Sequence, residues 1–102
     1  MHHRIEFTRH ADSDSTQAYE WYEAQEEGAG RYFSRRLIEL IELIGDQPLS
    51  FPASHRSFRK GLMKNFPYAV YFQICGDKIV IAAIIHGARN PRLTAQLLRR
   101  PR

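Results

Sequence analysis

The hydrophobic pattern of this chain changes its period near the middle, and this change constrains the fold more than any other feature. Over residues 31–44, apolar side chains recur at helical spacing, at Phe33, Leu37, Leu40, Ile41 and Ile44. After residue 67 the pattern alternates with the period of two that is typical of a strand. Helical segments followed by strands predict a domain of the α+β class.

The first half of the chain predicts two helices. Asp14, with Gln17 three positions later, resembles a capping box, so a helix is expected from there to about Gln25. Its buried face should hold Ala18 and either Trp21 or Tyr22. The glycines of residues 28–30 break the pattern, and the periodic segment after them is the second helix, with Arg35 and Glu39 spaced to form an ion pair. Two helices joined so closely form an antiparallel hairpin.

The second half predicts the sheet. Residues 57–59 form a short strand, and residues 68–74 alternate up to the two-residue hairpin turn Gly76-Asp77. Residues 79–85 are apolar throughout, which indicates a central strand that is covered on both faces. With an N-terminal strand at residues 4–7 and a short helix at residues 93–98, we expect an antiparallel sheet with the helix hairpin packed on one face.

Length and composition limit the class of protein. The chain has 102 residues, which suits a single domain spanning 1–102. Cys75 is the only cysteine, so the chain forms no internal disulfide and no multi-thiolate zinc site. Neither a membrane-spanning apolar run nor a signal-peptide pattern is visible in the sequence. We therefore expect a cytoplasmic protein that needs no metal and no cofactor.

Charge is divided between the two halves. Residues 1–46 contain 5 Lys/Arg and 10 Asp/Glu, whereas residues 47–102 contain 10 Lys/Arg and only one acidic residue, Asp77. A basic region of this kind attracts nucleic acid or an acidic protein segment. An ordinary solvated surface is an equally simple explanation of the charge alone.

Several short motifs follow one another between residues 21 and 91. They are Trp21-Tyr22, Gly28 and Gly30 before Phe33, Pro48 and Pro52, Arg59, Phe66-Pro67-Tyr68 with Val70-Tyr71, and the His-x-x-Arg-x-Pro pattern of His86, Arg89 and Pro91. Together, and in this order, they make the chain resemble the ParE-like plasmid-stabilisation toxins of the RelE/ParE superfamily.

This resemblance implies the toxin of a type II toxin–antitoxin system, held in a hetero-oligomer by its cognate antitoxin. ParE-like members of the superfamily poison DNA gyrase without a catalytic site of their own. RelE-like members are ribosome-dependent messenger-RNA endonucleases that need no metal. A third alternative is a basic module that binds nucleic acid.

The residues themselves favour a toxin that is not an enzyme. A metal-independent endoribonuclease would use Arg59, His86 and Arg89, with His86 transferring the proton and the arginines holding the phosphate. However, Tyr68 stands where the nucleases carry an arginine, and no acidic residue lies between Asp46 and Asp77 to act as a base. Each of the three candidates also has an ordinary structural explanation, such as capping a strand or forming a turn.

The C-terminal end is rich in arginine, and we predict that it contacts the target or the antitoxin. The residues in question are Arg92, Arg99, Arg100 and Arg102. Exposed arginines of this kind pair with acidic side chains or with phosphates. The alternative is a solvated basic tail.

Overall fold

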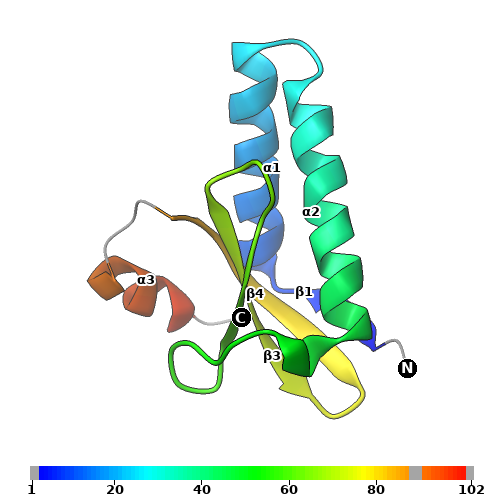
Figure 1. The fold of residues 1–102 in the computed structure, drawn as a ribbon. Coiled ribbons are helices and arrows are strands. Elements are labelled where there is room, and N and C mark those ends of the chain that lie inside the picture. The colour runs from blue at the N-terminus through cyan, green and yellow to red at the C-terminus, as the bar shows by residue number, and fades with distance from the viewer. Residues whose placement is uncertain (1–2, 88–90, 101–102) are drawn as a thin grey trace.

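The structure is a computed structural model that describes residues 3–87 and 91–100 of the chain. Its elements in chain order are β1 (Arg4–Phe7), α1 (Arg9–Gln25), α2 (Ala29–Asp46), the 3-10 turn η1 (Pro48–Ser50), β2 (Arg59–Leu62), β3 (Tyr68–Cys75), β4 (Lys78–His86) and α3 (Pro91–Leu98). Figure 1 shows the long α1–α2 hairpin standing beside the sheet, with the short helix α3 set apart from it. The expected α+β class and the C-terminal helix are confirmed.

The four strands form one sheet in the order β1-β4-β3-β2. The pairs β2–β3 and β3–β4 are antiparallel, as expected, but β1 runs parallel to β4, so the sheet is mixed. The helix hairpin explains this difference. It returns the chain to the start of β1, where the His3 N–H donates to the Gly45 carbonyl at 2.8 Å. Strand β2 therefore starts from the same end of the sheet as β1. Because β3 and β4 each reverse the direction, β4 runs parallel to β1 again.

Helix α1 begins at Arg9, five residues before the predicted capping residue Asp14. Thr8 is the N-cap, and its Oγ1 accepts a hydrogen bond from the Ala11 N–H at 3.0 Å. Ala18 is buried as expected, whereas the Trp21 side chain is 57% exposed. The prediction of the helix start was wrong because both Thr8 and Asp14 have side chains that can cap a helix. Strand β1 ends at Phe7, so Thr8, which follows it directly, becomes the cap.

Helix α2 carries the apolar stripe that its sequence predicts. Phe33, Leu37, Leu40, Ile41 and Ile44 are all buried against α1 and the sheet. The predicted pair of Arg35 with Glu39 is replaced by Arg36 with Glu39, whose Nη1 and Oε1 are 3.0 Å apart. Arg36 is one residue closer to Glu39 than Arg35 is, and a spacing of three also places two side chains side by side on the helix surface.

The hairpin is closed at its tip by Gly28 and Gly30. Gly28 has φ of 90°, a conformation that glycine adopts without strain. At Gly30, a Cβ would lie 2.7 Å from the Tyr19 carbonyl oxygen, so only glycine lets the two helices approach this closely. The expected tight connection is confirmed.

The sheet is covered on both faces. Phe72, Ile79 and Ile81 are fully buried on the side of the helix hairpin. On the other side, Ile85 lies in a second cluster with Ala69, Tyr71, Ala83 and Leu98. The expectation that β4 is covered on both faces is confirmed, and α3 supplies the second cover that the hairpin alone could not.

Candidate functional site

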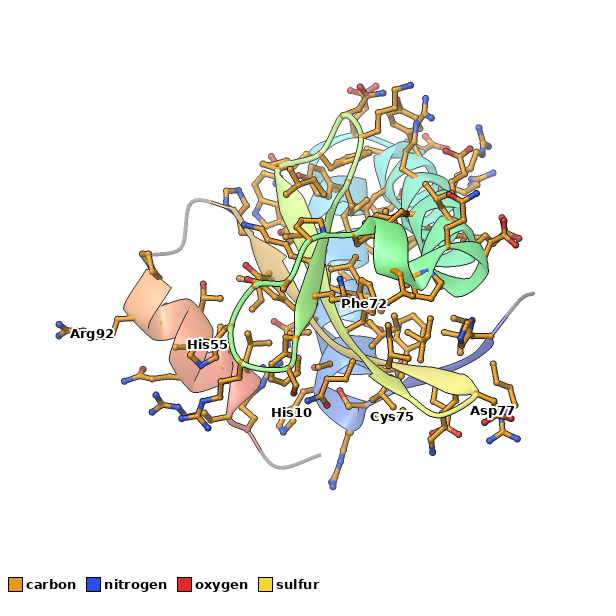
Figure 2. All side chains as sticks on the ribbon, turned by 60° about the horizontal axis from the view of Figure 1, so that its bottom comes forward. His10, His55, Phe72, Cys75, Asp77 and Arg92 are labelled. Atoms are coloured by element: carbon orange, nitrogen blue, oxygen red, sulfur yellow. The ribbon has the colours of Figure 1, made fainter. Side chains whose placement is uncertain are left out.

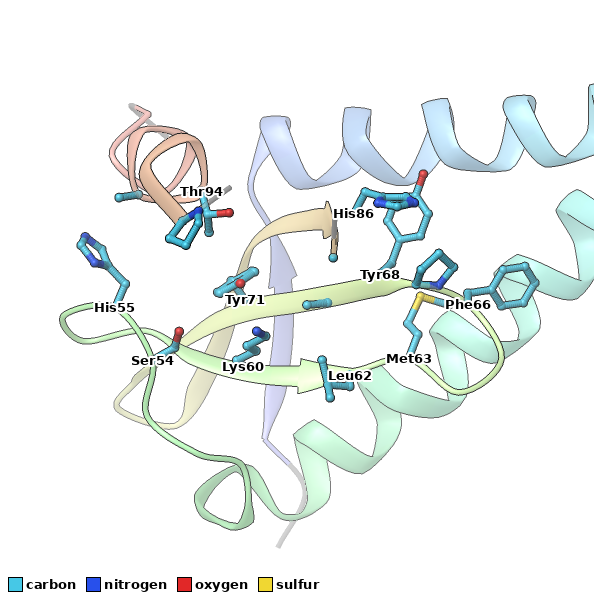
Figure 3. Close-up of a pocket in the computed structure, with 15 residues that line it drawn as sticks. Ser54, His55, Lys60, Leu62, Met63, Phe66, Tyr68, Tyr71, His86 and Thr94 are labelled. Atoms are coloured by element: carbon cyan, nitrogen blue, oxygen red, sulfur yellow. The ribbon is translucent and has the colours of Figure 1, made fainter. Parts of the chain in front are cut away.

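A cavity of about 540 Å³ lies between the second face of the sheet and the helix α3. Strands β2, β3 and β4 contribute to its lining, together with the loop before β2 and the first turns of α3. Figure 3 shows Lys60 and Tyr71 near its centre, His55 at one end, and Tyr68 with His86 at the other. Three other hollows in the described part of the chain are smaller, with volumes of about 40, 420 and 500 Å³.

His86 reaches this cavity from the last residue of β4. It pairs in register with Tyr68 of β3, and the two rings meet edge to face with centroids 5.2 Å apart. Tyr68 in turn contacts Phe33 and Tyr22 in the aromatic core of the hairpin. Burial raises the pKa of the Tyr22 hydroxyl, and Tyr68 beside it raises that pKa further. The end of β4 is therefore held by a packed aromatic cluster.

Arg59, which the sequence analysis grouped with His86, faces the opposite side of the sheet. Its Nη1 donates to the Phe51 carbonyl at 2.7 Å, and its side chain is half-buried. Because alternate residues of a strand share a face, Arg59 lies on the side of Gly61, where a Cβ would touch Phe51 and Leu40. The structure thus shows Arg59 tying the loop before β2 to the sheet.

Lys60, the next residue, lines the cavity instead of Arg59. Lys60 pairs with Tyr71 across β2 and β3, and its Nζ lies 5.8 Å from the centre of the Tyr71 ring. Sequence reasoning missed Lys60 because the sequence does not determine the register of β2 on β3, and this register decides whether Arg59 or Lys60 faces the cavity. A shift of one residue in a strand exchanges the two faces.

No aspartate or glutamate is among the described residues that line the cavity. Within residues 3–87 and 91–100 there is also no cluster of three side chains able to hold a metal ion. Proton abstraction from a ribose hydroxyl needs a base near the phosphate. In the described part of the cavity, the side chains left for that purpose are histidine, lysine and tyrosine.

The C-terminal arginines have different environments. Arg92 and Arg99 are exposed, and Figure 2 shows Arg92 pointing away from the domain at the outer side of α3. Arg100 instead donates from Nη2 to Asp14 Oδ2 at 3.1 Å, and the two side chains are only 23% and 19% exposed. Arg89 and Arg102 lie outside the described residues. Arg92 and Arg99 are therefore the described arginines of this group that remain exposed for a partner.

An apolar groove lies between α1 and α2 and reaches Phe7 at the end of β1. It has a volume of about 420 Å³ and is lined by Phe7, Leu37 and Ile41 together with Tyr19 and Ile38. Ile38 is 56% exposed, Phe7 41% and Tyr19 37%, so three large apolar side chains face solvent here. Exposed apolar side chains gathered in a groove give a surface that an apolar segment can cover. The helical period alone could not show it, because the period identifies only the inward face.

The tip of the hairpin is fixed by Glu23. Its two carboxylate oxygens accept hydrogen bonds from the N–H groups of Gly28, at 3.0 Å, and Gly30, at 2.9 Å. The bond from Gly28, followed by that from Gly30, lowers the pKa of Glu23 below its ordinary value. The first donors of α2 are thus satisfied within the hairpin, which leaves this helix end closed to an external anion.

No helix in the described part of the chain has both the length and the hydropathy to cross a bilayer.

The arrangement of a helix hairpin and a four-stranded sheet is shared with a solved structure described as "Chromosomal ParDE TA system from P. aeruginosa". The two chains superpose with a TM-score of 0.72 at 19% sequence identity, over 82% of this chain and 95% of that one. This likeness shows that the fold is that of a ParE-like toxin domain.

The family model described as "ParE toxin of type II toxin-antitoxin system, parDE" matches residues 5–91. The chain belongs to this family and is the toxin component of a type II toxin–antitoxin system. None of the curated protein sequences matches it at a significant level. The sequence-based resemblance to ParE-like toxins is therefore confirmed.

Proposed function

We propose that this toxin arrests growth by binding and inhibiting DNA gyrase, and that it is not an enzyme. The observation that carries this proposal is the composition of the cavity around His86. Its described lining contains no carboxylate, and Arg59, the predicted phosphate ligand, is bonded to the backbone on the other face of the sheet. Membership of the ParE family supports the same target.

The arginines of the C-terminal region form the target-binding surface in this proposal. Arg92 and Arg99 are exposed on and after α3, while Arg89 and Arg102 flank the described part of that region. Exposed charges accelerate association and are screened by salt over a Debye length of about 8 Å. Inhibition of gyrase should therefore weaken as the salt concentration rises.

The antitoxin occupies the apolar groove of the hairpin in this proposal. Ile38, Phe7 and Tyr19 present apolar surface that an amphipathic segment can cover, and such segments commonly fold as they bind. Changing Ile38 to aspartate should weaken antitoxin binding strongly, because it puts a charge into the centre of an apolar contact. Leu49→Asp is the matched control, since Leu49 is 73% exposed and lies outside the groove.

One observation favours the alternative, a ribosome-dependent messenger-RNA endonuclease. His86 and Lys60 are both among the residues that line the cavity, so a proton-transfer group and a cation contribute to one hollow, although they lie on opposite faces of the sheet. Such an enzyme would lose its activity on His86→Ala, since general acid–base catalysis contributes typically ~10²–10⁴-fold. Arg89, the third residue of the predicted nuclease set, lies outside the described residues.

The experiment that separates the two mechanisms measures both activities on the same samples. Purified wild type and His86→Ala are assayed for inhibition of gyrase supercoiling and for cleavage of messenger RNA on ribosomes. We expect inhibited supercoiling with intact messenger RNA, and an His86→Ala variant that inhibits gyrase as wild type does once its folding is verified. Ribosome-dependent cleavage that disappears in His86→Ala would instead establish the nuclease.

A further inference from the structure

Trp21 is the only tryptophan of the chain, and its side chain is 57% exposed. Tryptophan is highly buried on average in folded proteins, so this exposure is unusual. The Trp21 ring lies edge to face with the Tyr22 ring at a centroid distance of 5.0 Å. Tyr22 in turn packs against Phe33 and Phe66 in the aromatic core of the hairpin. Trp21 therefore rests on a rigid support and presents a large apolar surface to solvent.

Trp21 lies on the side of α1 that is opposite to the apolar groove. Tyr19 lines that groove, and Trp21 does not. The two residues are two positions apart in a helix, which is a rotation of about 200° around the helix axis. A segment that fills the groove between α1 and α2 therefore leaves Trp21 uncovered.

The side of α1 around Trp21 is poor in charge. Its members recur at helical spacing, and we call them the Trp21 strip: His10, Asp14, Gln17, Trp21, Ala24 and Gln25. The single carboxylate of the strip, that of Asp14, already accepts hydrogen bonds from the Ile84 N–H and from Arg100. The centres of protein interfaces are likewise depleted of charge and enriched in aromatic side chains.

The Trp21 strip is continuous with the C-terminal arginines. Arg100 Nη2 lies 3.1 Å from Asp14 Oδ2, and Asp14 is about 10 Å from Trp21 along the axis of α1. Arg100 also lines a small hollow together with His10, and the next residue towards α3, Arg99, is exposed. Figure 1 shows α3 on the side of α1 that faces away from α2. An exposed indole and exposed cations thus lie on one side of the domain.

We propose that the Trp21 strip is the apolar centre of the surface that binds gyrase, with Arg92 and Arg99 as its charged rim. This inference rests on the proposed function and names the residue on which target binding most depends. The complementary surface of gyrase is an apolar pocket that takes the indole and is bordered by acidic side chains. Tryptophan and arginine are the residues most enriched among interface hot spots. The antitoxin and gyrase then use opposite sides of α1.

The test compares wild type with Trp21→Ala in two assays, inhibition of gyrase supercoiling and binding of the co-expressed antitoxin. Trp21→Ala should need about 30-fold more protein for the same inhibition, the loss typical of a hot spot, while its affinity for the antitoxin stays unchanged. Leu49→Ala is the control, because Leu49 is 73% exposed and belongs neither to the strip nor to the groove. Inhibition by Trp21→Ala that equals inhibition by Leu49→Ala would overturn the inference.

Salt distinguishes the indole from the arginines in the same assay. Burial of apolar surface is not a charge interaction, whereas exposed charges are screened. Trp21→Ala should therefore keep the salt dependence of wild type, and the variant with serine at both Arg92 and Arg99 should lose part of it. A salt dependence that falls as much in Trp21→Ala as in the arginine variant would contradict an apolar role for Trp21.

The wild-type chain tests the same surface without any substitution at Trp21. Incorporation of hydroxytryptophan at this single position allows its fluorescence to be excited apart from the tryptophans of gyrase. Gyrase should protect this fluorescence from quenching by acrylamide, and the antitoxin should not. Protection by the antitoxin, protection by duplex DNA alone, or no protection by gyrase at inhibitory concentrations would each refute the inference. A wild type that does not inhibit gyrase at all would refute the proposed function itself, and this inference with it.

Discussion

Asp14 connects three parts of the fold, and its replacement gives the sharpest prediction about stability. Its Oδ2 atom accepts a hydrogen bond from the backbone N–H of Ile84 in β4 at 3.0 Å. The same oxygen accepts from Arg100 Nη2 at 3.1 Å, which attaches the segment after α3 to α1. Strand β1 pairs with β4 only as far as Ile81, so the Asp14 carboxylate supplies the acceptor for the Ile84 N–H that a longer β1 would have supplied from its backbone.

The magnitude of the effect follows from what Asp14→Ala leaves behind. Ile84 is 3% exposed, so its N–H loses its partner in a buried position, which costs about 1–3 kcal/mol. The partly buried pair with Arg100 contributes about 1 kcal/mol more. For a domain of this length, a total loss of about 2–4 kcal/mol corresponds to a decrease of about 10–20 °C in Tm.

The assay is thermal and urea unfolding of a short series of variants. Asp14→Ala should be the least stable, whereas Asp14→Asn keeps an acceptor for the Ile84 N–H and Arg100→Gln removes only the charge pair, so both should lose less. Glu20→Ala, at an exposed position of the same helix, is the control. If Asp14→Ala proves no less stable than Glu20→Ala, the role assigned to this carboxylate is refuted.

Three further predictions concern the hairpin and the basic surface. Gly30→Ala should lower stability by about 1–3 kcal/mol in urea unfolding, because the new Cβ would lie 2.7 Å from the Tyr19 carbonyl oxygen; the gain usual for alanine in a helix would contradict the close approach. The N–H groups of Gly28 and then Gly30 lower the pKa of Glu23 from 4.5, so this stabilisation should be complete above pH 4.5 and disappear as the pH falls through the lower pKa of the folded state. Acid unfolding of Glu23→Gln should lack that component, and an unchanged profile would disprove it. Changing Arg92 and Arg99 together to serine should weaken gyrase inhibition and its salt dependence, whereas Arg35→Ser should not; equal effects would argue against a localised surface.

Most of the fold could be predicted from the sequence, because strong periodic patterns determine it. The stripe from Phe33 to Ile44 and the continuous apolar run of residues 79–85 each allow one way to bury their surface. The parallel pairing of β1 could not be predicted in this way. It depends on where the hairpin returns the chain, beside His3, and no local pattern records that position.

The candidate site was harder to predict, because it depends on single-residue register and on pairs distant in sequence. Arg59 and Lys60 are basic neighbours, and only the register of β2 on β3 decides which of them faces the cavity. Asp14 looked like a helix cap, yet its partners, Ile84 and Arg100, lie 70 and 86 residues away along the chain. Side chains that bridge distant elements leave no periodic trace in the sequence.

The central claim is that this chain is a toxin silenced by a partner protein, and co-expression tests it most directly. Growth of a host with intact gyrase is followed after induction of the chain alone, and after induction together with the small protein encoded beside it. We predict arrest in the first case, and in the second normal growth with both chains recovered as one complex. Normal growth on induction of the folded chain alone, at a level of expression verified in the same cells, would contradict the account.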